Sequence, residues 1–257
     1  MGNFGSNIDP HIYHEIAETA LNALVKNKYP GKLLRSCEPE LCVKGLLRPL
    51  TEWLPTKTWR SNEQIVRRQF LTPPAIAYLL IYLLNLQENE IALASSAGTG
   101  SLASWASRFG LETHTNEINE RRRKLLRFLG FNPTSFNAES INDFLPFEII
   151  PDVLVMNPPF SSSSGRTANN SSKLGFQHVE SALERLKKSG KFGIILGNST
   201  GLNTKTGREF WRRMSGEKTR LNHNRSVSFA PDKIINISVE NVESGIVAAK
   251  RLGIRLN

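Results

Sequence analysis

The sequence has little cysteine and fewer acidic than basic residues. Only two cysteines, Cys37 and Cys42, occur in 257 residues. One such pair cannot build a disulfide framework, and it lacks the third and fourth ligands of a zinc site. We therefore expect reduced thiols with a structural role.

Long hydrophobic runs are also absent. No apolar segment approaches the roughly 18 residues that a membrane span requires. The first ten residues contain neither a basic stretch followed by apolar residues nor an arginine-rich amphipathic pattern. Hydrophobic residues make up 39% of the chain and charged residues 22%, which is ordinary for a folded soluble protein. These features predict a cytoplasmic protein without a membrane partner.

Metal-ligand spacing is missing as well. Of five histidines, only His11 and His14 are close in sequence, and no further ligand lies near them. We expect no metal site, and we expect ordinary surface positions for the histidines, His114, His178 and His223 included.

Basic residues are plentiful. Lysine and arginine number 33 against 23 acidic residues, which gives a net charge of +10. Such a charge suits a polyanionic partner, because cationic side chains replace counterions on phosphates, but it also fits a solvated cationic surface. The clusters Arg67-Arg68 and Arg212-Arg213 lie on or beside predicted helices. So does the run 121–124, for which a solvated face is expected.

Two regions are expected along the chain. Helical spacing of apolar residues predicts an amphipathic helix from Asp9 to about Lys28 and a second helical region over 38–54. The polar stretch 55–62 contains proline and predicts a linker. The sequence thus predicts an N-terminal helical region over 1–62 and a main domain over 63–257.

Short apolar strands alternate with longer helices in the main domain. This order is typical of a doubly wound, mostly parallel sheet, so we expect an α/β, Rossmann-like fold with an N-terminal helical extension. Thr72 is expected to cap a helix over 75–86. The expected strands are 91–93, 112–115, 134–136, 153–156 and 192–196, the expected helices are 101–109, 119–129 and 174–188, and 161–172 is expected to be a mobile loop.

A glycine-containing turn follows the first expected strand. In the segment Ser96-Ala97-Gly98-Thr99-Gly100 the glycines allow a sharp turn and close approach to a ligand. Glu117 follows the next strand, where a carboxylate can accept both ribose hydroxyls of an adenosyl or dinucleotide ligand. The first loop of such a sheet is a nucleotide-binding position, so the two features together predict a nucleotide-like ligand.

The most specific motif ends the strand 153–156. Asn157 follows this apolar strand, and Pro158, Pro159 and Phe160 come next. An exocyclic ring amine is a poor nucleophile because its lone pair is delocalised. The Asn157 side-chain oxygen and the Pro158 carbonyl can accept its two hydrogens, and Phe160 can stack on the ring. A base held in this way must be flipped out of a duplex or be single-stranded.

These motifs, in this order, resemble the N6-adenine DNA methyltransferases of the class I fold. The residues that carry the resemblance are Phe70-x-Thr72-Pro73-Pro74, Ser96 to Gly100, Asn116-Glu117 and Asn157 to Phe160. The sequence is most similar to the methylase portion of strawberry-notch-like methylase/helicase proteins of bacteria, phages and plasmids. The resemblance covers about residues 69–198 and implies S-adenosylmethionine as cofactor, DNA as substrate and a helicase region or subunit as partner.

The resemblance also implies roles for individual residues. Thr72 and Pro73 would hold the methionine end of the cofactor, Ser96 to Gly100 would line it, Glu117 would bind its ribose, and Asn137 and Ala138 would lie at its adenine. Asn157, Pro158, Pro159 and Phe160 would hold the target base. In the serine-rich loop, Arg166 and Lys173 are candidates for phosphate contacts, because this loop follows the catalytic corner.

Some residues depart from the family pattern. Ala94 and Ser95 stand where the family has an acid and a proline, and Asn137 replaces an acid. Only some sixty residues follow Asn198, so we expect either a fragment or a decayed copy of a longer protein. Weak strand patterns occur there over 226–230 and 246–249. The alternatives are methylation of RNA adenine or protein glutamine, or a catalytically impaired nucleic-acid-binding remnant.

Overall fold

Short runs of apolar and β-branched residues form the strands of one parallel sheet. The computed structural model describes residues 10–28, 38–52, 54, 72–158, 171–195, 205–214 and 234–236. Its strands are β1 (Ile91–Ala94), β2 (Glu112–Thr115), β3 (Val153–Met156), β4 (Lys191–Ile194) and β5 (Ile234–Asn236). They lie in the order β2-β1-β3-β4-β5, and every pairing is parallel. The predicted Rossmann-like α/β fold is confirmed for this part of the chain.

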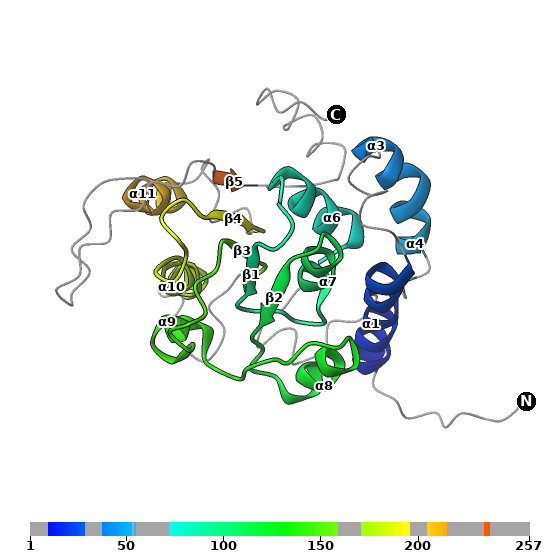
Figure 1. Cartoon of the computed structure of the whole chain (residues 1–257), viewed down its shortest axis with the longest axis horizontal. Helices are drawn as coiled ribbons and strands as arrows, with labels where there is room; N and C mark the ends of the chain where they lie inside the picture. Colours follow the sequence, from blue (N-terminus) through cyan, green and yellow to red (C-terminus); the bar gives the residue numbers. More distant parts are fainter. Residues whose placement is uncertain are drawn as a thin grey trace, which may run out of the picture.

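Helices cover both faces of the sheet (Figure 1). Along β3, Val153 and Val155 pack into the cluster that includes α6 (Pro74–Leu83) and α7 (Ser101–Arg108). Leu154 and Met156 point to the other face, into the cluster that includes α10 (Ser171–Leu183) and α11 (Lys205–Met214). Successive strand residues point to opposite faces, so a strand buried on both sides must be apolar at every position.

Most predicted helices are present, with shifted ends. The remaining helical segments are α1 (Pro10–Lys28), α3 (Pro39–Leu41), the π-helix η1 (Cys42–Leu47), α4 (Arg48–Glu52), α8 (Glu120–Phe128), the 3₁₀ helix η2 (Ala138–Ser140) and α9 (Ile141–Phe144). The start of α10 takes up the last two residues of the segment 161–172 that was expected to be a loop. Segments 55–62, 226–230 and 246–249, and the proposed boundary at residue 62, lie outside the described residues.

The predicted cap of α6 is wrong. Pro73 occupies the N-cap position of this helix, and no side chain makes a capping hydrogen bond. The Thr72 hydroxyl instead accepts a hydrogen bond from Asn157 Nδ2 at 2.8 Å. Proline at the first helical position leaves fewer N–H groups to cap, which releases Thr72 for this contact.

The predicted strand over 134–136 is reduced to a single bridge between Asn116 and Thr134. The backbone N–H and C=O groups of Phe136 do not join a strand ladder, because both are bonded to the Asn116 side chain. A side-chain amide therefore replaces the backbone pairing that the apolar pattern suggested.

The N-terminal helix α1 buries a polar face. Of the apolar positions that predicted this helix, Val25 is fully buried but Ile16 is 49% exposed, whereas Glu15, Glu18 and Asn22 are buried. Figure 1 shows α1 against α7 and α8. The buried polar groups have partners on α8 and in the turn before α7, and a buried polar group is tolerated when it is hydrogen-bonded.

The basic cluster 121–124 at the start of α8 was expected to be a solvated face, and this expectation is only partly right. Arg122 is only 4% exposed, and its Nε donates to Glu15 Oε1 at 2.8 Å. Arg121 Nε donates to the second oxygen of Glu15 at 2.7 Å. Lys124 does lie on the surface, beside Glu120. Two of the four cations therefore tie α1 to α8.

No helix in the described part of the chain combines the length and the apolar character that would allow it to cross a membrane.

Replacing Glu15 by glutamine should destabilise the fold. Burial alone would raise the pKa of Glu15, but hydrogen bonds and attraction from Arg121 and Arg122 outweigh it and hold the pKa below 4.5. Glu15→Gln leaves a buried guanidinium without its counter-charge, so we expect the free energy of unfolding to fall by about 3 kcal/mol in urea titrations at neutral pH.

The difference should shrink in acid, because a carboxylate whose pKa is lowered in the fold loses its contribution as the pH falls through that pKa. Glu40→Gln is the matched control, since Glu40 pairs with Lys44 on an exposed helix face. This substitution should lower the free energy of unfolding by about 0.5 kcal/mol or less. Equal effects of the two substitutions would contradict a buried ion pair.

Candidate functional site

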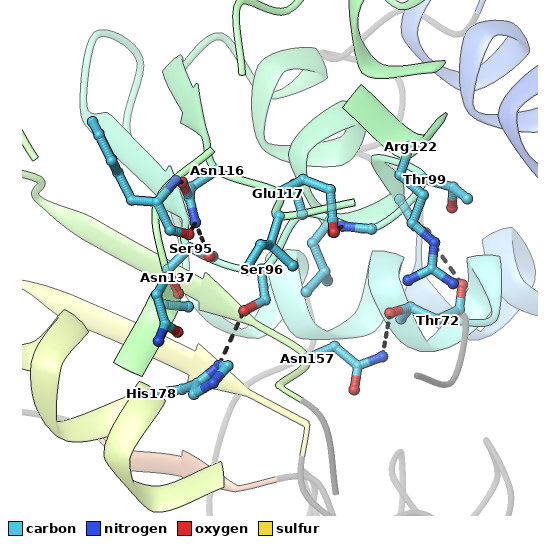
Figure 2. Close-up of a pocket in the computed structure, with 17 residues that line it drawn as sticks. Thr72, Ser95, Ser96, Thr99, Asn116, Glu117, Arg122, Asn137, Asn157 and His178 are labelled. Carbon is cyan, nitrogen blue, oxygen red and sulfur yellow. Dashed lines mark hydrogen bonds between the residues drawn. The ribbon is translucent and has the colours of Figure 1, made fainter. Parts of the chain in front are cut away.

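A pocket opens at the carboxyl edge of the sheet, where β1, β2 and β3 end (Figure 2). The chain leaves β1 toward β2 on one side, whereas β3 pairs with β1 on the other side, so this edge is the topological switch point where such sheets bind ligands. The lining residues are Thr72, Ser95, Ser96, Ala97, Gly98, Thr99, Ser101, Leu102, Asn116, Glu117, Ile118, Arg122, Phe136, Asn137, Ala138, Asn157 and His178.

The turn between β1 and α7 forms one wall. Gly98 and Gly100 have φ angles of +58° and +93°, a region that disfavours other residues. A Cβ on Gly98 would meet nothing within 4 Å, so this backbone leaves space for a ligand. A Cβ on Gly100 would lie 2.8 Å from Leu129 Cδ1 and 3.0 Å from Leu126 Cδ2, so a side chain here would crowd the end of α8.

Glu117 closes the turn from the end of β2. Its two oxygens accept hydrogen bonds from the N–H groups of Gly98 and Asn119, each at 2.8 Å. The residue is 4% exposed. Burial raises the pKa of Glu117 above 4.5, although Arg122 and the two backbone donors oppose the shift. A buried carboxylate held by backbone donors at this position suits a ligand with paired hydroxyls.

Asn116 joins the three loops around the pocket. Its Nδ2 donates to the carbonyls of Ser95 and Phe136, both at 3.0 Å. Its Oδ1 accepts from Phe136 N and Thr134 Oγ1, both at 2.8 Å. All four bonding positions of one amide are thus used. Asn116 belonged to the resemblance, but no role in the site was predicted for it.

Asn137 and Ala138, which were predicted to lie at the adenine of the cofactor, are among the residues that line the pocket. The Asn137 side chain caps the short helix η2, since its Oδ1 accepts from Glu139 N at 3.1 Å. Phe136 precedes them, and its ring stacks on that of Phe144 with centroids 5.8 Å apart.

Asn157 reaches the pocket from the end of β3. Its Nδ2 donates to Thr72 Oγ1, and in Figure 2 its amide oxygen points away from Thr72. The structure thus places Asn157 in the same pocket as Gly98 and Glu117, which lie 59 and 40 positions earlier in the sequence. This juxtaposition was the central requirement of the sequence-based hypothesis.

The other predicted residues are only partly described. Pro158 is buried at the end of β3, and it is not among the lining residues, nor are Pro73 and Gly100. Pro159, Phe160 and Arg166 lie outside the described residues. Lys173 lies in α10, where only its backbone is described.

His178 is a lining residue that sequence reasoning missed. A surface position was expected, but the residue is 9% exposed and faces the pocket from α10. Its Nδ1 lies 3.4 Å from Ser96 Oγ (Figure 2). Burial lowers the pKa of His178 to about 4, so the imidazole is neutral at physiological pH. Apolar Ala182 follows His178 by four residues and so lies on the same helical face, and this spacing was the available signal for an inward position.

The sequence matches no protein-family profile and no curated protein. Similar folds occur among solved structures. TrmN from Thermus thermophilus is 19% identical with a TM-score of 0.44, over 57% of this chain and 44% of that one. A putative RNA methyltransferase from Pyrococcus horikoshii is 20% identical with a TM-score of 0.47, over 67% and 81% of the two chains.

A modification subunit of a putative type I restriction enzyme from Vibrio vulnificus is 13% identical with a TM-score of 0.46, over 69% of this chain and 42% of that one. The chain thus spans less than half the length of the Thermus and Vibrio proteins. At these identities the likeness concerns the fold alone.

Removing the Asn116 side chain should destabilise the protein. Asn116→Ala leaves the carbonyls of Ser95 and Phe136 and the N–H of Phe136 without their partner, so we expect a loss of about 3 kcal/mol in the free energy of unfolding, measured in urea. Thr113→Ala on β2 removes one local hydrogen bond and serves as the control, for which we expect a loss of about 1 kcal/mol or less. A loss no greater than that of the control would contradict the joining role.

Proposed function

We propose that this chain binds S-adenosylmethionine in the pocket and methylates an exocyclic amino nitrogen, with N6 of adenine in DNA as the target. The observation that carries the proposal is the position of Asn157. It lies at the end of β3, in one pocket with the glycine turn and Glu117. A cofactor held at the turn can therefore meet an acceptor-bearing side chain across the switch point.

The chemistry of the pocket fits the cofactor. Glu117 is a buried carboxylate beside Gly98, and the space next to the Gly98 backbone is open. This combination suits a ribose with two hydroxyls. Phe136 and Asn137 lie on the neighbouring wall, where an aromatic ring and an amide can contact an adenine. Bound there, the cofactor would supply an electrophilic methyl group on a sulfonium.

Asn157 supplies the orientation that the target amine needs. The bond to Thr72 fixes the direction of the amide nitrogen and turns the oxygen the other way. That oxygen accepts one hydrogen of the amine, which draws the nitrogen toward a tetrahedral form and frees its lone pair for the methyl carbon. The bound cofactor would supply the methyl group, its sulfur would keep the electron pair of the C–S bond, and the extra amine proton would be released to solvent water while Asn157 holds the amine in place. The second acceptor, the Pro158 carbonyl, and stacking by Phe160 are further parts of the proposal.

DNA is the proposed substrate, with the base flipped out of a duplex or already single-stranded, because an amine inside a duplex cannot reach such a pocket. The net charge of +10 favours a polyanion. Arg166 and Lys173 are proposed to contact phosphates, and a helicase region or subunit is the proposed partner. RNA adenine and protein glutamine offer the same planar nitrogen.

Asn157→Ala should abolish methyl transfer while leaving cofactor binding within about threefold, because Asn157 acts on the acceptor amine. The measurement is transfer of labelled methyl from S-adenosylmethionine to DNA, RNA and protein acceptors, with S-adenosylhomocysteine binding followed by calorimetry. Asn142→Ala, which removes an exposed hydrogen bond to Glu184 at a distance from the pocket lining, is the control and should keep full activity.

Each outcome has a defined meaning. Incorporation into protein alone would end the nucleic-acid proposal, and incorporation into RNA alone would replace DNA by RNA. Cofactor binding without transfer to any acceptor would favour the impaired remnant. No binding at millimolar ligand would overturn the proposed function itself.

Cofactor affinity should depend on the ionisation of Glu117. Its pKa is raised in the fold, so the carboxylate becomes protonated at a higher pH than an ordinary glutamate would. Only the ionised form can accept both ribose hydroxyls without competition, so affinity for S-adenosylhomocysteine should fall as the pH is lowered from about 8 to about 5. Glu117→Gln should bind at least about tenfold more weakly at neutral pH, with a flatter pH profile. Identical profiles for the two proteins would contradict the ribose role.

A further inference from the structure

Two buried carboxylates near the pocket have no part in the proposed chemistry. Glu15 and Glu18 come from α1, and they are 0% and 2% exposed. Asn22 lies on the same face of this helix, one turn further on, and is 1% exposed. Burying these groups is costly unless they are hydrogen-bonded, so their partners show what the polar face of α1 is for.

The partners of Glu18 and Asn22 lie in the glycine turn. Glu18 Oε2 accepts a hydrogen bond from Thr99 Oγ1 at 2.7 Å. Asn22 Nδ2 donates to the Thr99 carbonyl at 3.1 Å. Thr99 stands between the two glycines with positive φ and is 2% exposed. Both the side chain and the backbone of the central residue of the turn are therefore held by α1.

Glu15 contacts the opposite wall. Its carboxylate accepts a hydrogen bond from Arg122 Nε at 2.8 Å, and Arg122 lines the pocket. The Arg122 charge acts in turn on Glu117, whose carboxylate holds the N–H of Gly98. The polar face of α1 thus reaches the glycine turn from two directions.

We propose that α1 is a positioning element of the cofactor pocket, in which Glu18 and Asn22 hold the turn 98–100 in its binding conformation. This inference rests on the proposed function. Glycines with positive φ leave a turn with many accessible conformations, and a ligand that had to order the turn would lose affinity. Hydrogen bonds from a packed helix order the turn beforehand, so the ligand does not bear this cost.

The test measures affinity for S-adenosylhomocysteine by calorimetry, together with the melting temperature. Glu18→Ala and Thr99→Val each remove the same hydrogen bond, so each should weaken binding about tenfold, and the double variant should be no weaker than the weaker single variant. Glu18→Gln keeps an oxygen that accepts from Thr99 and should bind within about threefold of the wild type. Glu40→Gln, on an exposed helix face, is the control and should bind normally.

The outcomes separate this inference from the function on which it rests. Absence of binding by the wild-type protein would overturn the proposed function. Normal binding by the wild type together with variants that melt at lower temperature but bind equally well would overturn the positioning role. Losses that multiply in the double variant would overturn it as well, because the two residues would then act independently.

A further variant keeps the proposal testable if Glu18→Ala does not fold. Asn22→Ala removes only the bond to the Thr99 carbonyl and should weaken binding about fivefold. Unchanged affinity of this variant would overturn the proposal.

Discussion

The pocket depends on one side-chain amide. Asn116 bonds to Ser95 at the end of β1, continues β2 itself, and holds both backbone groups of Phe136 and the Thr134 hydroxyl on the third segment. A parallel sheet aligns its strands but leaves the loops beyond their ends free to diverge. Four hydrogen bonds from a residue that is 1% exposed fix three such segments relative to one another.

The buried charged groups around Asn116, namely Glu15, Glu117 and Arg122, each have hydrogen-bond partners. Arg122 lies between the walls of the pocket and α1, where Glu15 compensates its charge, while Glu117 is held by two backbone N–H groups. These contacts join helix α1, which is early in the sequence, to the edge of the sheet. Because a buried polar contact is costly to break, the N-terminal helix and the pocket wall behave as one structural unit.

The chemistry of the sheet edge then follows from position. The turn between β1 and α7 and the residue after β3 flank the switch point, so one ligand can contact Gly98, Glu117 and Asn157 together. Neutral His178 and Ser96 add a polar pair on the side of α10. In the proposed function, the Asn157 side chain would face the cofactor across this gap, which is the arrangement that transfer to a planar nitrogen needs.

The sequence by itself determined the parallel sheet, the glycine turn after its first strand, and the placement of Glu117 and Asn157 just beyond strand ends. Strand periodicity and the residues that follow a strand are local signals. It did not determine the bridge at Thr134, where the Asn116 amide takes the place of a strand ladder. Nor did it determine the buried positions of Glu15, Arg122 and His178, for which apolar patterning predicted the surface or an opposite helix face. Only the tertiary structure decided these, because a polar side chain can be buried only where a distant segment supplies its hydrogen-bond partner or the packing around it, and no local pattern carries that information.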